Sequence, residues 1–114
     1  MPEEDISRYG AYLQGVRHAS QNTVSSYLRD VTQFSQYLAE RGHTLRQADS
    51  GMVRDYMYWM HRHGKSAASV TRFLASIKSF YGFLLTAGDV EVNPEKGISA
   101  DRAERKYPEI LIRQ

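Results

Sequence analysis

The sequence Lys65-Ser-Ala-Ala-Ser-Val-Thr-Arg-Phe-Leu-Ala-Ser-Ile-Lys-Ser-Phe-Tyr81 has the periodicity of an amphipathic helix. At about 100° per residue, its apolar stripe contains Val70, Leu74, Ile77, Tyr81 and, further along, Leu84. The opposite side gathers Lys65, Ser69, Arg72, Ser76 and Ser79. Ser66 suits an N-cap and Gly88 suits the C-terminal end, so the stretch predicts one long helix.

The polar side of this predicted helix contains cations and hydroxyl groups but no carboxylate. No acidic residue occurs between Asp55 and Asp89. A face that only meets solvent would normally mix in Glu and Asp, whereas short hydroxyls beside cations suit a helix that lies against nucleic-acid phosphates or in a groove. A plain basic surface helix is the alternative.

Three further helices are predicted before this one. They run from about Pro2 to His18, from an N-cap at Asn22 to Gly42, and from Asp49 or Ser50 to Gly64. No stretch shows the alternation of a half-buried strand, so the predicted fold is all-α. After Gly88, Pro94 allows a short fifth helix to begin at about Glu95.

Composition places the chain among single-domain soluble proteins. It has 114 residues, 41% of them hydrophobic, and no apolar run approaches the roughly 20 residues that span a bilayer. There is no cysteine, and Met-Pro-Glu-Glu-Asp at the start does not resemble a signal peptide, so we expect a cytoplasmic protein. The net charge of +2 is small, but the basic excess falls in residues 49–88.

A second candidate for anion binding lies at the start of the second predicted helix. Ser20, Asn22, Thr23 and Ser26 cluster there, where backbone N–H groups have no partner inside the helix. Simple capping is the alternative interpretation of these residues. The phosphate interpretation gains weight beside the predicted helix after Ser66, with Arg62 and Lys65 near enough to neutralise neighbouring phosphates.

Catalytic and metal-binding patterns are weak. His43-Thr-Leu-Arg46 has the spacing of a phosphoryl-transfer pair, but it falls in a predicted loop with no tyrosine evidently near it, so we assign it no catalytic role. His61 and His63 would point about 200° apart on a helix, so they cannot share one metal ion. We predict no catalytic residue, metal site or cofactor.

Four segments follow a pattern known from one protein family. They are Ser20-Gln-Asn-Thr-Val-Ser-Ser-Tyr-Leu-Arg-Asp30, Thr71-Arg-Phe-Leu-Ala-Ser-Ile-Lys-Ser-Phe-Tyr-Gly-Phe-Leu84, Asn93-Pro94 and Lys106-Tyr-Pro-Glu-Ile-Leu111. Together they resemble the N-terminal core-binding domain of tyrosine recombinases of the Xer and phage-integrase type. The resemblance implies a SAM-like bundle of four main helices plus a short C-terminal helix, forming half of a clamp around double-stranded DNA.

The resemblance also implies which residues contact DNA. Carried over residue by residue, the set is Ser20, Asn22, Thr23, Ser26 and Arg29 from the second helix, Lys65, Ser69, Arg72, Ser76 and Lys78 from the fourth, and Arg105 and Lys106 from the linker. Arg62 joins this set from the reasoning on charge, and Arg72 is the candidate for reading a base edge. The alternative is a helical protein-interaction module that does not bind nucleic acid.

The division of the chain follows the same resemblance. Residues 1–100 are expected to form the DNA-binding domain, 101–108 a basic linker, and 109–114 the start of a catalytic domain that is missing here. The catalytic Arg, His and Tyr of the family would belong to that domain, so this chain would bind DNA without cutting it. The whole recombinase would cleave through a phosphotyrosyl intermediate and assemble as a tetramer on paired sites.

Overall fold

The computed structural model describes residues 2–15 and 18–94 of the chain. The elements are α1 (Pro2–Gly15), α2 (Gln21–Glu40), the short 3-10 helix η1 (Leu45–Gln47), α3 (Ser50–Arg62) and α4 (Ala67–Ala87). The described part of the chain contains no strand, so the all-α prediction is confirmed. None of these helices is long and apolar enough to cross a membrane.

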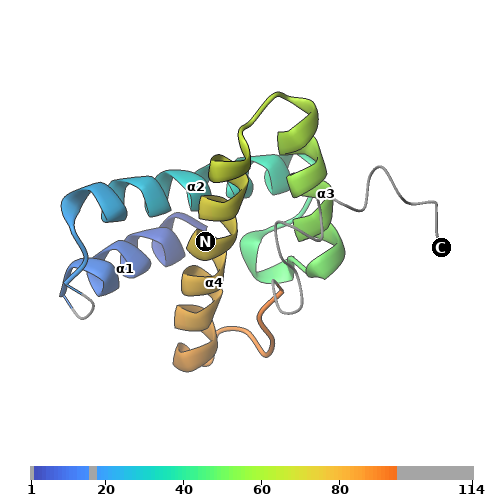
Figure 1. Ribbon diagram of the computed structural model, residues 1–114. Coiled ribbons are helices and arrows are strands. Elements are labelled where there is room, and N and C mark those ends of the chain that lie inside the picture. Colours follow the sequence, from blue (N-terminus) through green and yellow to red (C-terminus); the bar gives the residue numbers. More distant parts are fainter. Residues whose placement is uncertain (1, 16–17, 95–114) are drawn as a thin grey trace.

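Helix α4 is the centre of the bundle. Figure 1 shows α1 and α2 running side by side, with α4 crossing them and α3 on the far side of α4. Helix α2 packs on both α1 and α4, and α3 packs on α4. Because α4 has neighbours on two sides, it must bury more of its surface than a helix that covers only one face of a core.

Aromatic rings join these helices in the core. Phe34 of α2 is fully buried, and its ring centroid lies 5.1 Å from that of Tyr56 in α3 and 5.4 Å from that of Phe73 in α4. At the other end of α4, Phe80 packs edge to face on Tyr9 of α1 at 5.3 Å. One continuous core therefore holds all four helices.

The helix boundaries agree with most of the predicted caps. Asp49 accepts a hydrogen bond from the backbone N–H of Met52, and Ser66 caps α4 in the same way through Ser69. Gly88 ends α4 in the left-handed conformation with φ of 84°. The cap of α2 was predicted wrongly, because the hydroxyl of Ser20 accepts from the N–H of Thr23 and Asn22 lies inside the first turn.

The predicted apolar stripe of α4 is too narrow. The residues that the structure buries on this helix are Val70, Phe73, Leu74, Ser76, Ile77, Phe80, Tyr81 and Leu84. Ser76 has no exposed surface, so its expected place on the outer face is wrong. The reason is the crossing of α4 over α2, which covers an arc of the helix that its own periodicity left polar.

The loop after α2 has a structural role. Leu45 in η1, an element that was not predicted, is buried, and its carbonyl accepts a hydrogen bond of 2.6 Å from the Tyr81 hydroxyl. Burial raises the pKa of Tyr81, so this hydroxyl stays protonated as a donor. The expectations for a fifth helix, a linker and a following segment concern residues 95–114, which lie outside the described residues.

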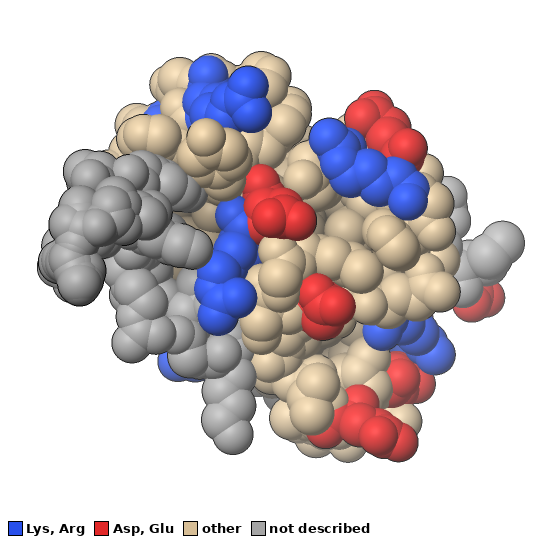
Figure 2. Space-filling model, turned by 90° about the vertical axis from the view of Figure 1, so that its right-hand side faces the viewer, with Lys and Arg blue, Asp and Glu red and all other residues tan. Residues whose placement is uncertain are grey.

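Charges of both signs are interspersed on the side of the molecule where α3 lies. Figure 2 shows Lys and Arg next to Asp and Glu on this face, without a large region of one sign. Helix α3 itself carries Arg54 and Asp55 as exposed neighbours. Such a surface suits contact with solvent and gives no preference for an anion.

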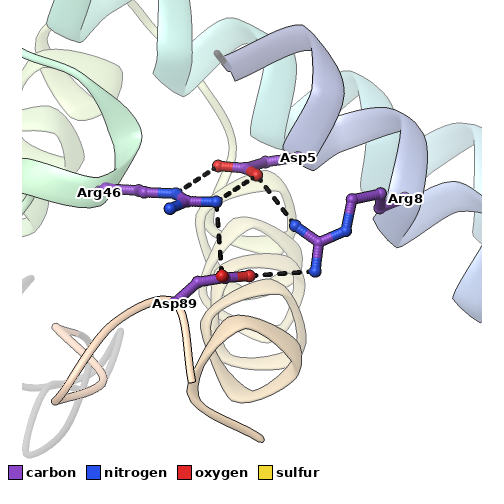
Figure 3. A network of polar contacts seen from close by, with 4 residues as sticks. All are labelled: Asp5, Arg8, Arg46 and Asp89. Carbon is purple, nitrogen blue, oxygen red and sulfur yellow. Dashed lines mark hydrogen bonds and ion pairs between the residues drawn. The ribbon is translucent and has the colours of Figure 1, made fainter. Parts of the chain in front are cut away.

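A network of four charged side chains ties the start of α1 to the end of α4. Arg46 donates to both carboxylate oxygens of Asp5 at 2.8 and 2.9 Å, and Arg8 donates to Asp5 and to Asp89 at 3.2 and 3.0 Å. Figure 3 shows the four side chains converging from three segments. The Asp5 side chain is 4% exposed, so the network neutralises a buried carboxylate.

This network should make stability depend on acid pH. Hydrogen bonding from Arg46 lowers the pKa of Asp5 below its ordinary value of 3.8. A lowered carboxyl pKa contributes stability above that ordinary value, and this contribution is lost as the pH falls through the lowered pKa. We expect Arg46→Ala to reduce the free energy of unfolding at pH 7, and the difference from the wild type to shrink below pH 3.8.

Urea denaturation at several pH values measures this difference. Arg54→Ala is the matched control, because Arg54 is exposed on α3 and outside the network. If Arg46→Ala and Arg54→Ala show the same stability over the whole pH range, the network contributes nothing to folding.

Candidate nucleic-acid interface

A buried carboxylate sits where α2 and α4 cross. Asp30 of α2 is 4% exposed and accepts hydrogen bonds of 2.8 Å from Nε and Nη2 of Arg72. The hydroxyl of Ser76 donates to the same carboxylate at 2.8 Å. The hydrogen bonds to Asp30 raise the pKa of Arg72, so its guanidinium stays charged at neutral pH. The two helices are therefore locked together by a two-pronged ion pair.

This ion pair changes the interpretation of Arg72. Two of the three guanidinium nitrogens face Asp30, while 40% of the side chain stays exposed. Arg72 therefore lies at the surface as predicted, but with its charge matched by a carboxylate inside the protein. To contact a base or phosphate it would use its remaining edge or leave Asp30.

The exposed side of α2 next to this pair carries no carboxylate before Glu40 in the last turn of the helix. Ser26, Arg29 and Gln33 share a face by their spacing of three and four residues. Between Gln21 and Ala39 the only acidic residue is Asp30, which is buried and paired. Burial of Asp30 therefore leaves Glu40, in the last turn of α2, as the exposed carboxylate of this helix.

The exposed side of α4 has the same character. Ala68, Thr71, Ala75 and Lys78 are all exposed and fall on one face of the helix. Their side chains are short except for Lys78, so another molecule can come close to the backbone of α4. Helix α4 contains no acidic residue. Side by side, α4 and the part of α2 before Glu40 present exposed side chains without a carboxylate. The face near α3, in contrast, carries mixed charges (Figure 2).

The predicted site residues fall into separate groups. One group consists of the N-cap Ser20 and residues in the first half of α2. Ser20, Asn22 and Arg29 are exposed, while Thr23 and Ser26 are half-buried. Ser69 and Arg72 are half-buried on α4, and Lys78 is exposed. Ser76 is in the core.

Two of the predicted cations lie on or next to α3. Lys65 lines a cleft with Gln33 and Trp59 on the α3 side of α2, and the Arg62 guanidinium lies 5.5 Å from the ring centroid of Tyr58 on α3. Arg105 and Lys106 are outside the described residues. Whether any of these residues contacts DNA stays a prediction.

Sequence reasoning missed part of this surface. Ala68, Thr71 and Ala75 recur at spacings of three and four residues and give α4 its low profile. Their helical periodicity is visible in the sequence, but Ala68 and Ala75 carry no charge or hydrogen-bonding group that would mark them as part of a site. No group of three or more potential metal ligands occurs within residues 2–15 and 18–94.

Residues 6–88 match the family described as phage integrase, N-terminal SAM-like domain. The chain belongs to this family. The match covers every described helix apart from the first residues of α1. The SAM-like bundle expected from the resemblance is therefore confirmed, with α2 and α4 crossing at its centre.

Members of the tyrosine recombinase family are similar over nearly the whole chain. A putative tyrosine recombinase of Caldanaerobacter subterraneus is 36% identical over 111 residues, which is 97% of this chain and 38% of that protein. Tyrosine recombinase XerC of Vibrio cholerae is 35% identical over 109 residues, or 95% of this chain and 35% of that protein. XerC of Escherichia coli is 33% identical over 105 residues, or 91% of this chain and 35% of that protein.

This phage integrase SAM-like chain thus spans about a third of the length of the relatives it matches. No solved structure matches it.

Proposed function

We propose that this chain is the DNA-binding clamp domain of a site-specific tyrosine recombinase, and that the α2–α4 surface lies on double-stranded DNA. The observation that carries the proposal is the pairing of buried Asp30 with Arg72, which leaves α4 and the part of α2 before Glu40 without an exposed carboxylate. Arg29 and Lys78 then supply uncompensated positive charge on the two sides of the crossing. The names of the relatives support the same role in recombination.

The organisation of the whole recombinase is proposed from its resemblance to these relatives. Residues 1–100 form the clamp domain, 101–108 a linker along the DNA backbone, and 109–114 lead into a catalytic domain. That domain would carry out strand cleavage and exchange through a phosphotyrosyl intermediate, in a tetramer on paired sites. This chain by itself would hold DNA and leave it intact.

Binding should be weak, electrostatic and dependent on salt. Non-specific DNA binding by such surfaces has dissociation constants of about 10⁻⁴ to 10⁻⁶ M, and each phosphate neutralised adds about 0.9 to the slope of log affinity against log salt. We expect Arg29→Ala together with Lys78→Ala to lower the slope by about 2 and to weaken binding about tenfold at low salt. Fluorescence anisotropy with a labelled 20-base-pair duplex measures both.

The control for this experiment is Arg54→Ala on the mixed-charge face of α3. Arg29→Ala and Lys78→Ala are also measured separately. The loss of duplex affinity for Arg54→Ala should be less than half of the loss for either of these single variants. Equal losses for all three positions would mean that binding follows total charge and that α2 and α4 have no special role. Absence of binding to any duplex at low salt would instead support the protein-interaction module.

A further inference from the structure

A groove in the corner between α1, α2 and α4 has features that the proposed interface does not explain. It has a volume of about 480 Å³ and begins at Ala75 and Lys78, which are already part of the α2–α4 surface. The groove continues from there toward α1. Its lining is completed by Tyr12, Tyr27, Ser79, Gly82, Phe83 and Thr86.

The chemistry of this lining is that of an anion site. It offers one ammonium group and four hydroxyl groups, and no carboxylate occurs among the residues that line it. Hydroxyls of Ser, Thr and Tyr together with Lys are the side chains that contact DNA phosphates. A groove that served only packing or an apolar peptide would not need this concentration of donors.

The hydroxyl groups are not engaged by the protein itself. Within the described residues, Tyr12 and Tyr27 make no side-chain hydrogen bond, and the Oγ atom of Ser79 is buried without a partner. A buried hydroxyl without a partner is unfavourable, and an oxygen acceptor placed in the groove would supply one. The ring of Tyr12 is held in place by Phe83, with the centroids 4.9 Å apart.

Gly82 in the wall of the groove also indicates that another molecule binds there. Glycine inside a helix costs about 1 kcal/mol relative to alanine, so a reason for it is expected. A Cβ atom added at Gly82 would meet nothing within 4 Å, so packing inside the protein does not require glycine there. Close approach of another molecule to the α4 backbone does explain it.

We propose that this groove binds a backbone phosphate of DNA, with Lys78 neutralising its charge and the hydroxyls of Tyr12 and Tyr27 donating to its oxygens. The proposal rests on the proposed function and extends the interface from α2 and α4 to α1. Lys78 connects the two parts because it lies on the exposed face of α4 and in the groove. Tyr12, Tyr27, Ser79 and Gly82 were not among the predicted site residues.

Conservative variants separate hydrogen bonding from charge. Tyr12→Phe and Tyr27→Phe remove one hydroxyl each and leave the rings in place, so stability to urea should not change. We expect each to weaken duplex binding roughly three- to tenfold without altering the salt slope, because no charge is lost. Tyr58→Phe removes an exposed hydroxyl on α3 outside the groove, so it is the control and should bind like the wild type.

A charge placed in the groove gives a second measurement. We expect Gly82→Glu to weaken binding at least tenfold, because its carboxylate would occupy the phosphate position. Leu85→Glu makes the same charge change on an exposed position of α4 outside the groove and should have a clearly smaller effect. Both are measured by anisotropy on the same 20-base-pair duplex, with circular dichroism to confirm folding.

The outcomes distinguish the two proposals. If the wild type binds and the α2–α4 variants weaken it, but Tyr12→Phe and Tyr27→Phe bind normally and Gly82→Glu equals Leu85→Glu, the groove proposal is overturned and the proposed function stands. If the wild type does not bind the duplex at low salt, both are overturned.

Discussion

Replacing Arg72 with methionine is expected to lower the free energy of unfolding by about 3 kcal/mol, because it leaves the buried carboxylate of Asp30 without its counter-charge. Asp30 is 4% exposed and would keep only the hydrogen bond from Ser76. Arg72 itself is 40% exposed, which places the loss at the lower end of the range for buried ion pairs. Urea denaturation at pH 7 measures it.

A double variant shows whether the loss comes from the unpaired charge. Asp30→Leu combined with Arg72→Met removes both charges and should recover most of the stability, since replacing a buried pair by apolar groups is often neutral. If Arg72→Met alone is as stable as the wild type, the ion pair is not formed in solution and Arg72 is free for other contacts.

The double variant also tests the predicted role of Arg72 in base reading, because it is expected to fold. If Arg72 reads a base edge, the double variant should bind different duplexes with more equal affinity than the wild type, with about 1–3 kcal/mol of discrimination lost at one position. If Arg72 serves only to lock α2 on α4, the relative affinities for different duplexes should not change.

Replacing Phe34 with alanine should lower the free energy of unfolding by about 3–5 kcal/mol, at least as much as Arg72→Met. Its ring is fully buried and lies against Tyr56 of α3 and Phe73 of α4. Removing it leaves a cavity where three helices meet, and these neighbours are too tightly held to fill it. Thermal and urea unfolding measure the loss, which is a large part of the 5–15 kcal/mol typical of a domain.

Phe34→Leu and Leu85→Ala are the controls for the loss of stability in Phe34→Ala. The leucine variant keeps most of the apolar volume and should lose much less stability than Phe34→Ala. Leu85 is exposed on α4, so truncating it should change stability by under about 0.5 kcal/mol. A loss for Phe34→Ala no larger than that of Leu85→Ala would contradict the packing of this core.

The starts and ends of the helices were predictable because local rules set them. Ser66 and Gly88 bracket α4 as expected, and Asp49 caps α3, since capping depends only on residues within one turn. The error at α2 has a local cause as well. Ser20 and Asn22 are both good N-caps, and the sequence offers no means of choosing between them until the turn before the helix is placed.

The absence of carboxylates from the candidate surface on α4 was predicted, but the exposure of individual residues was partly predicted wrongly, for one physical reason. The absence of acidic residues on α4 is visible along the chain, but the carboxylate that pairs with Arg72 comes from 42 residues earlier. Helical periodicity gives the direction of each side chain around the helix axis. It does not show which of these side chains a neighbouring helix will bury. Ser76 was placed outside on that basis and lies inside.

The sequence alone therefore determined four helices, most of their caps, a carboxylate-free α4 and membership of a recombinase family, because periodicity, capping and family patterns are properties of neighbouring residues. The tertiary structure decided which polar residues are buried, that Asp30 neutralises Arg72, that Asp5 and Asp89 share two arginines, and that Tyr12 and Tyr27 meet Lys78 in one groove. Those facts depend on how the helices cross, and the crossing is set by the packing of the whole core.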